Sequence, residues 1–260
     1  MLTAGVDMGS LTTAAAVCND EDLLAWEIVS TGADAEEAGR EALSGSCRKA
    51  NIAVSDPDVI VATGYGRVNL EEADEQITEI TCHGKGADVL FNETGTVIDI
   101  GGQDSKVIRI DDNGMVVDFE MNDKCAAGTG RFLEVMAEAL EVELSQLGKL
   151  SQQADKEVNI SNMCAVFAES EVVSRVAEGY SRSSIIKGIH RSIAERISTM
   201  VERVGMVRPV IMTGGVAKNS GVVKCLEEEL CCDINIPEEP QIVGALGAAL
   251  LACRQDSVRA

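Results

Sequence analysis

The chain has 260 residues, enough to form one large domain or two small ones around a substantial core. Its 43 acidic side chains outnumber its 22 basic ones and give a net charge of -21, which argues against the broad basic surface that nucleic acid requires. No stretch approaches the roughly 20 apolar residues that cross a bilayer, and the N-terminus lacks a signal-peptide pattern. We therefore expect a cytoplasmic protein with neither membrane nor nucleic-acid partners.

The first part of the chain predicts a small sheet followed by helices. Three short apolar stretches predict an antiparallel meander, at residues 2–6, 14–18 and 23–28. A helix, a strand and a mostly helical segment are expected after them, at residues 35–50, 59–63 and 71–87. A second meander then repeats the plan, at residues 97–100, 106–110 and 115–119. The repetition indicates a structural duplication.

The second part of the chain predicts mainly helices of an α/β fold. Three helices are expected first, at residues 128–143, 165–178 and 185–204. A strand, a helix, a strand and an apolar helix follow, at residues 210–212, 222–230, 233–236 and 244–253. We expect the last helix to return to the first lobe. The predicted domains are therefore residues 1–93 with 243–260, and residues 94–242.

Three of the predicted strands run into glycine turns. Asp7 is followed by Gly9 and Ser10, and Asp99 is followed by Gly101, Gly102 and Gln103. The third strand runs into Gly214 and Gly215. A hairpin seldom needs two adjacent glycines plus an acid, whereas a loop that binds phosphate and its metal uses both. The first turn taken alone is an ordinary one, but the three together indicate one nucleotide held in a cleft.

The chemistry that fits these turns is phosphoryl transfer to water, which depends on positioning and charge stabilisation. Asp7 and Asp99 are expected to face each other across the cleft and hold a hydrated Mg²⁺, with Gln103 or Asp99 orienting the attacking water. We expect the phosphates to lie against Ser10, Leu11, Thr12, Thr13, Gly101, Gly102 and Lys106. We expect the adenosine to lie against Gly214, Gly215, Val216, Ala217 and Gln241.

Two of the nine cysteines have unusual surroundings. Cys125 and Cys164 each lie where a helix is expected to begin, whose dipole favours a thiolate, and small residues after Cys125 leave room for a bulky ligand. A cubane cluster needs four such ligands, which a symmetric dimer could supply. The residues alone favour ordinary buried thiols, with a cluster as the alternative. His83 and His190 show no ligand spacing, so we expect surface or core roles for them.

Seven stretches together resemble one known family: residues 62–67, 97–106, 121–134, 166–171, 188–191, 212–217 and 244–250. The family comprises the ATPase activators of (R)-2-hydroxyacyl-CoA dehydratases, which are related to the ATPase subunits of benzoyl-CoA reductase. It is part of the acetate and sugar kinase, Hsc70 and actin superfamily. The resemblance implies a two-lobed, duplicated ribonuclease H-like α/β fold.

The resemblance also implies an activity. In such proteins a homodimer holds one [4Fe-4S] cluster through two cysteines from each subunit, which match Cys125 and Cys164, so the preference for buried thiols is reversed. The dimer takes an electron from ferredoxin or flavodoxin and uses ATP to deliver it to the dehydratase at low potential. The alternatives are an ATPase reductase subunit for a benzoyl-CoA-type or double-cubane-cluster protein, and a cluster-free small-molecule kinase on the same fold.

The first phosphate loop departs from the family pattern. Leu11 and Ala14 stand where the family usually has Thr and Lys, and the lost Lys removes a charge that would meet a phosphate. The hydroxyls of Thr12 and Thr13 could compensate, and Lys106 is retained in the second loop. We therefore expect the second loop to contribute more than the first to phosphate binding.

Overall fold

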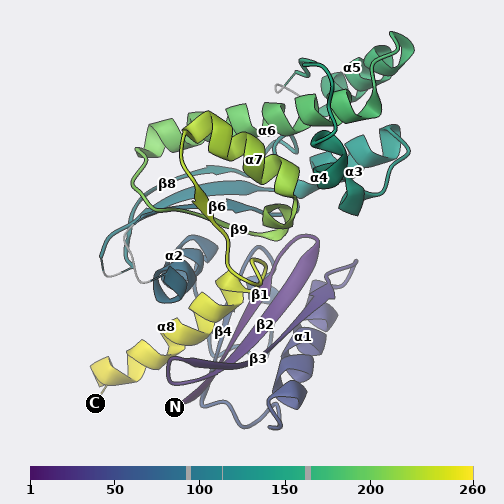
Figure 1. Cartoon of the computed structure of the whole chain (residues 1–260). Helices are drawn as coiled ribbons and strands as arrows, with labels where there is room; N and C mark the ends of the chain where they lie inside the picture. The colour runs from purple at the N-terminus through teal and green to yellow at the C-terminus, as the bar shows by residue number, and fades with distance from the viewer. Residues whose placement is uncertain (92–94, 113, 162–164, 260) are drawn as a thin grey trace. The chain divides into compact units, whose positions relative to one another are not determined.

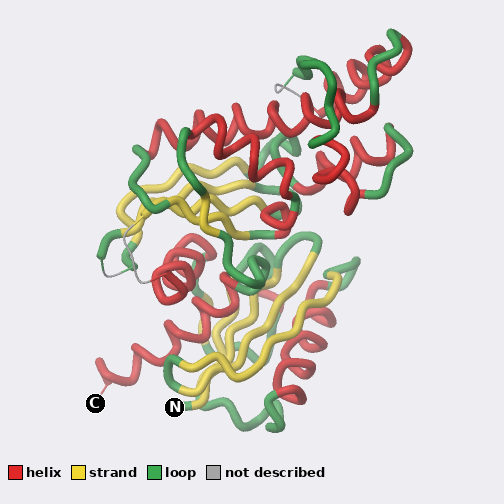
Figure 2. The backbone as a smooth tube through the Cα atoms, in the orientation of Figure 1, coloured by secondary structure: helices red, strands yellow, loops and turns green. Residues whose placement is uncertain are grey.

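The structure is a computed structural model that describes residues 1–91, 95–112, 114–161 and 165–259 (Figure 1). The chain forms two compact units, each containing helices and strands (Figure 2). The first unit comprises residues 1–97, 108–118 and 237–260, and the second comprises residues 98–107 and 119–236. The α/β class is therefore confirmed, whereas the domain boundaries expected at residues 93 and 242 stay a prediction.

The first sheet contains the meander that the sequence predicts. Its strands are β1 (Leu2–Met8), β2 (Thr12–Asn19), β3 (Asp22–Ser30), β4 (Val59–Thr63) and β5 (Glu75–Gln76), in the order β3-β2-β1-β4-β5. β2 pairs with β1 and β3 in antiparallel fashion, whereas β4 is parallel to β1. Because β1 and β4 are parallel neighbours, Asp7 near the end of β1 lies in register with Thr63 at the end of β4.

Helices cover both faces of the first sheet. Because side chains alternate along β1, successive residues of this strand contact helices on opposite faces. Val6 and Met8 belong to a core cluster with Leu43 of α1 (Ala35–Lys49). Gly5 lies on the other face, against the backbone of α8 (Val243–Arg259), where a Cβ would overlap the Ala245 carbonyl oxygen. The helix α2 (Glu79–Phe91) packs beside α8. This second face is the one that carries the Asp7 side chain.

The helix predicted over residues 71–87 begins later than expected. Asp74 accepts a hydrogen bond from the Ile60 N–H and donates its own N–H to the Ile60 carbonyl. The Ile77 N–H donates to the Ala62 carbonyl in the same way. These bonds hold the chain along β4 as the short strand β5, so helix formation waits until Glu79.

The second sheet also has five strands and contains the second meander. They are β6 (Gly95–Ile100), β7 (Ser105–Ile110), β8 (Val116–Asn122), β9 (Val210–Thr213) and β10 (Ile234–Asn235), in the order β10-β9-β6-β7-β8. β9 and β10 are parallel. All six residues of β6 are buried, so the Asp99 carboxyl stands on a fully covered strand.

The helices of the second unit share one large core with β6 and β9. They are α3 (Gly130–Ala139), α4 (Leu147–Ser151), α5 (Ala165–Ala177), α6 (Arg182–Val204) and α7 (Ser220–Leu230). Phe132, Ile193 and Leu226 pack there with Ile98 and Met212. The helix predicted over residues 128–143 is shorter than expected, because Thr129 is its N-cap and Glu141 takes a positive φ. The sequence reasoning missed α4.

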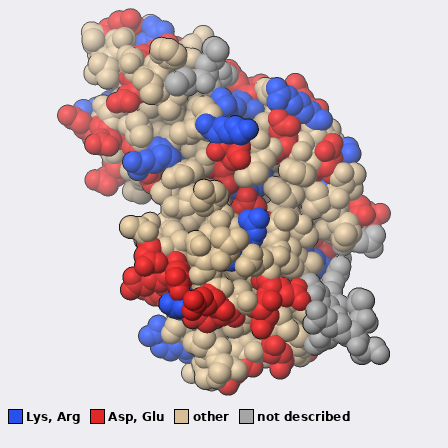
Figure 3. All heavy atoms as spheres, turned by 180° about the vertical axis from the view of Figure 1, so that it is seen from behind, with Lys and Arg blue, Asp and Glu red and all other residues tan. Residues whose placement is uncertain are grey.

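The surface of the described residues combines both signs of charge. In the face drawn in Figure 3, basic side chains (blue) stand beside acidic ones (red). Arg40, for example, pairs with Glu71 and Glu72 at 3.0 and 2.7 Å. Within the part of the chain that the structure describes, no helix is long and apolar enough to span a membrane.

Candidate functional site

Hydrogen bonds of Thr13 and Thr31 stabilise the first glycine turn. The Thr31 hydroxyl donates to the Gly9 carbonyl at 2.8 Å and contacts the Thr13 hydroxyl at 3.0 Å. The Thr31 N–H also donates to the Leu11 carbonyl. Thr13 is fully buried, so its hydroxyl stabilises the loop from inside rather than lying at its surface. Ser10 and Leu11 are half-buried at the turn.

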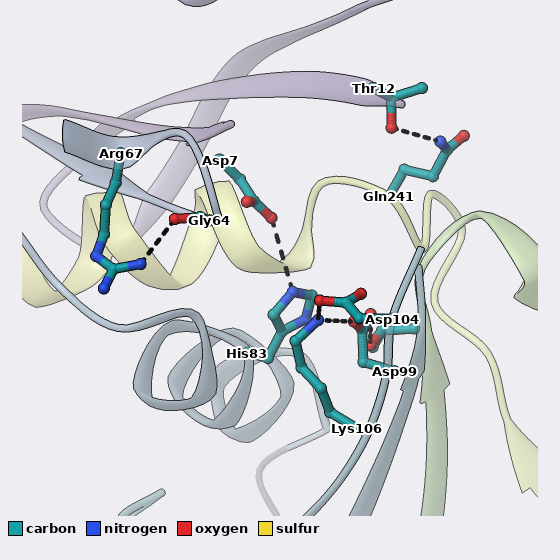
Figure 4. Close-up of polar contacts among 10 residues, drawn as sticks. Asp7, Thr12, Gly64, Arg67, His83, Asp99, Asp104, Lys106 and Gln241 are labelled. Carbon is teal, nitrogen blue, oxygen red and sulfur yellow. Dashed lines mark hydrogen bonds and ion pairs between the residues drawn. The ribbon is translucent and has the colours of Figure 1, made fainter. Parts of the chain in front are cut away.

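Thr12 is the exposed hydroxyl of this loop. It accepts a hydrogen bond of 3.3 Å from the Gln241 side-chain amide (Figure 4). Gln241 therefore joins the first glycine turn, whereas the sequence reasoning grouped it with the third. Ala14, at the position where the family usually has Lys, is 3% exposed and packs with Ala245 of α8.

Asp7 lies between two glycines and a histidine. Its Oδ2 is 3.6 Å from Nε2 of His83, which stands on α2 and is 6% exposed (Figure 4). Gly64, with φ of 83°, lies against Asp7 Oδ1, and Gly244 lies against Oδ2. The buried position of His83 fits the core role that the sequence allowed for it, and its closeness to Asp7 depends on a contact between two elements that spacing along the chain does not reveal.

Asp99 and Lys106 form a buried ion pair at the two strands that flank the second glycine turn. Their side chains are 4% and 3% exposed, and Lys106 Nζ is 3.2 Å from Asp99 Oδ2. Lys106 also pairs with Asp104 Oδ2 at 2.8 Å (Figure 4). Thr213 donates to Asp99 Oδ1 at 2.8 Å. Both oxygens of Asp99 are thus engaged. The sequence reasoning did not select Asp104, which is the more exposed of the two carboxylates.

The second glycine turn is hydrogen bonded to the start of α3. The Gly101 N–H donates to the Asp104 carbonyl at 3.0 Å, which closes the turn. The N–H groups of Gly130 and Arg131 donate to the carbonyls of Gly101 and Gly102 at 2.9 and 2.8 Å. Two of the free N–H groups at the N-terminus of α3 are therefore used by the loop. Gln103 projects from the turn as an exposed residue.

The third glycine turn lies next to the second within the same unit. Gly214 has φ of 81°, and a Cβ there would overlap the Ile100 carbonyl oxygen and lie 2.8 Å from Asp99 Oδ1. Gly215 starts a short 3-10 helix in which Val216 and Ala217 are buried. Val216 and Ala217 belong to the core cluster of this unit, and the contact of this turn with adenosine stays a prediction.

A buried histidine lies behind the third turn. His190 Nε2 is 3.3 Å from Nδ2 of Asn219, whose side-chain oxygen caps α7. Burial lowers the pKa of His190 to about 4, so the imidazole is neutral at pH 7. The sequence expectation of a core histidine fits this position.

The two cysteines selected from the sequence differ in what the structure describes. Cys125 is a free, half-buried thiol in the segment between β8 and α3, where the Asn122 amide donates to its carbonyl at 2.9 Å. It is not at the start of a helix, because Thr129 caps α3, so this expectation was wrong. Cys164 lies outside the described residues, and α5 begins at Ala165.

The donor groups present suit the cofactors that the resemblance implies. A thiol with Ala126, Ala127 and Gly128 beside it fits an iron-sulfur ligand, and the carboxylate of Asp7 fits a hydrated magnesium ion. Among the described residues, no group of three or more His, Cys, Asp or Glu side chains gathers as a metal site.

Comparison with known proteins gives a consistent picture. The model of the BadF/BadG/BcrA/BcrD ATPase family matches residues 4–252. A 2-hydroxyisocaproyl-CoA dehydratase activator of Clostridioides difficile is 48% identical, over 97% of this chain and 95% of the relative. An activator of lactoyl-CoA dehydratase from Anaerotignum propionicum is 48% identical over 97% of both chains. A benzoyl-CoA reductase component of Thauera aromatica is 34% identical, over 96% of this chain and 92% of the relative.

Solved structures are similar over the whole chain. Component A of the (R)-2-hydroxyglutaryl-CoA dehydratase of Acidaminococcus fermentans is 45% identical, with a TM-score of 0.95 and 99% of both chains covered. The activator from Clostridium difficile with bound ADPNP is 45% identical, with a TM-score of 0.93 and coverage of 100% and 97%. A ROK family glucokinase from Streptomyces griseus, 15% identical with a TM-score of 0.61 and coverage of 98% and 100%, shares the fold alone.

Proposed function

Because the chain belongs to the BadF/BadG/BcrA/BcrD ATPase family, as its motifs predict, we propose that it is an ATP-dependent electron-transfer activator of a (R)-2-hydroxyacyl-CoA dehydratase. The observation that carries the proposal is the 48% identity, across 97% of the chain, to a protein named as such an activator. The ADPNP in a solved relative supports nucleotide binding here.

The nucleotide would be held by the backbone of the glycine turns. The first and second turns offer N–H groups to the phosphates, and the third offers a flat backbone to the adenine. Mg²⁺, when bound, would neutralise part of the phosphate charge, and the Asp7 carboxylate would accept hydrogen bonds from its water ligands. Because Asp99 is already engaged by Lys106 and Thr213, we assign it to fixing the second turn. We assign the orientation of the attacking water to Gln103.

The cysteines would hold the redox centre. Cys125 and Cys164 from each of two chains would supply the four thiolates for one [4Fe-4S] cluster, which gives the protein its one-electron carrier. This assignment requires a homodimer. Ferredoxin or flavodoxin would be the electron donor, and a cytoplasmic location stays a prediction.

The contact between the second turn and α3 suggests how the nucleotide would act on the cysteines. Gly101 and Gly102 are hydrogen bonded to the first residues of α3, and the segment before α3 carries Cys125. The helix α3 also packs against α5, which begins one residue after Cys164. A shift of the loop on loss of a γ-phosphate would therefore move both segments.

Iron analysis after strictly anaerobic purification tests this proposal. We expect about two iron atoms per chain and a [4Fe-4S] absorption band, because four thiolates bind four irons. Cys125→Ser should lose the iron and keep ADP binding. The exposed, free Cys231 provides the matched control, so Cys231→Ser should keep the iron. An iron-free wild-type protein from a cluster-competent host would refute the assignment.

The 34% identity to a component of benzoyl-CoA reductase favours a second candidate, an ATPase component for a reductase of that type or a double-cubane-cluster protein. The neighbouring genes would distinguish it from a dehydratase activator. A cluster-free kinase would instead transfer phosphate to an added sugar or acid, which our proposal does not expect.

A further inference from the structure

His83 is placed beside a residue of the nucleotide site although it was predicted to be an ordinary core or surface residue. It lies on α2 with 6% of its surface exposed, and its Nε2 is 3.6 Å from Asp7 Oδ2 (Figure 4). A separation of 3.6 Å is longer than a direct hydrogen bond and is within range of an electrostatic contact.

Glycines allow the helices α2 and α8 to approach each other closely beside Asp7. A Cβ at Gly247 of α8 would overlap the Cys82 carbonyl, and a Cβ at Gly86 of α2 would overlap the Val243 carbonyl. A Cβ at Gly244 would overlap Asp7 Oδ2 and lie 2.9 Å from His83 Nε2. Each glycine inside a helix costs about 1 kcal/mol relative to alanine, so the close approach is a costly feature of α2 and α8.

The other side of the Asp7 carboxylate is equally confined. A Cβ at Gly64 would lie 2.5 Å from Asp7 Oδ1, and the positive φ of Gly64 also disfavours other residues. Arg67 donates to the Gly64 carbonyl at 2.9 Å, which fixes this turn (Figure 4). The carboxylate is therefore held between Gly64 and the pair formed by Gly244 and His83.

We infer that His83 is a positioning residue, whose Nε2 holds Asp7 Oδ2 so that the carboxylate faces the hydrated cation of the nucleotide. The inference rests on the proposed function, because it gives Asp7 the role of accepting from magnesium-bound water. Outer partners of a metal site typically contribute 10- to 100-fold to metal affinity or activity, and because Asp7 contacts the ion through water we expect the lower end, about tenfold.

Substitutions at His83, with controls elsewhere in the protein, test the inference. His83→Ala should raise the Mg²⁺ concentration for half-maximal ATP hydrolysis by about tenfold. It should also weaken the Mg²⁺-dependent part of ADP binding, measured by calorimetry, without changing ADP affinity in the absence of Mg²⁺. His83→Gln, which can place an amide N–H near the position of Nε2, should restore most of both.

Cys82→Ala is the matched control, because Cys82 is fully buried on the same helix and packs against Ala248 of α8. It should lower the melting temperature as much as His83→Ala does but leave the Mg²⁺ dependence unchanged. The inference falls if His83→Ala matches wild type, if His83→Gln restores nothing, or if Cys82→Ala shifts the Mg²⁺ dependence equally. If wild type hydrolyses no ATP and Asp7→Ala leaves the Mg²⁺-dependent part of ADP binding unchanged, the proposed function is refuted, and the inference is refuted with it.

Discussion

At the scale of single residues, two partners of the candidate acids come from elements far apart in the sequence. Thr213 donates to Asp99 and His83 lies next to Asp7, whereas Lys106, which pairs with Asp99, stands on the next strand along the chain. The glycine and acid patterns predicted Asp7 and Asp99 as site residues, because an acid and glycines after a strand form a local signal. The contacts of Thr213 and His83 could not be predicted, since they depend on which strands and helices become neighbours.

Lys106 is expected to contribute mainly to stability. Replacing it by Met leaves the buried carboxylate of Asp99 without its counter-charge, and breaking such a pair costs about 3–5 kcal/mol. Urea unfolding in the absence of nucleotide would measure this loss. The Asp99→Asn, Lys106→Met double variant removes both charges and should recover most of the lost stability. A Lys106→Met protein as stable as wild type, but weaker in ADP binding, would instead identify Lys106 as a phosphate ligand.

At the scale of elements, the strands matched the sequence better than the helices did. β1 and β4 follow their apolar stretches, because alternating or continuous burial leaves a clear pattern. The helix predicted over 71–87 was wrong in its first part because the segment before Glu79 pairs with β4, a tertiary contact that helical periodicity does not register. Cys125 was placed at a helix start because Thr129 was not recognised as the N-cap.

The contact between the second turn and α3 makes a prediction at this scale. A Cβ at Gly130 would lie 3.2 Å from the Gly101 carbonyl oxygen, so Gly130→Ala should push the loop away and weaken two hydrogen bonds of about 1 kcal/mol each. We expect ATP-dependent electron delivery to fall about tenfold while ADP affinity changes little. Delivery would be measured as the rate of partner activation by pre-reduced protein.

The control for this variant is Glu138→Ala, on the exposed side of the same helix. It should leave electron delivery unchanged. If Gly130→Ala delivers electrons at the wild-type rate, the loop does not act on the cysteines through α3. If both variants slow delivery alike, a general weakening of α3 explains the effect.

At the scale of the whole molecule, the chain combines two α/β units, and we propose that each contributes residues to nucleotide binding. Asp7 and the first turn belong to the first unit, and Asp99 with the second and third turns belongs to the second unit. The duplicated fold was predictable because the meander pattern occurs twice in the sequence. The proposed cluster could not be predicted from one chain's residues, since two cysteines would become a complete ligand set only in a dimer.

The most direct test of the account is ATP-dependent activation of a dehydratase partner. The iron-loaded protein, reduced and freed of excess reductant, would be mixed with the dehydratases that the three activators compared above serve, and dehydration of each acyl-CoA would be followed. We predict that at least one dehydratase is activated with ATP, and none with ADP or with the Cys125→Ser protein. Activation without ATP, or no activation of any of the three by the iron-loaded protein, would contradict the account.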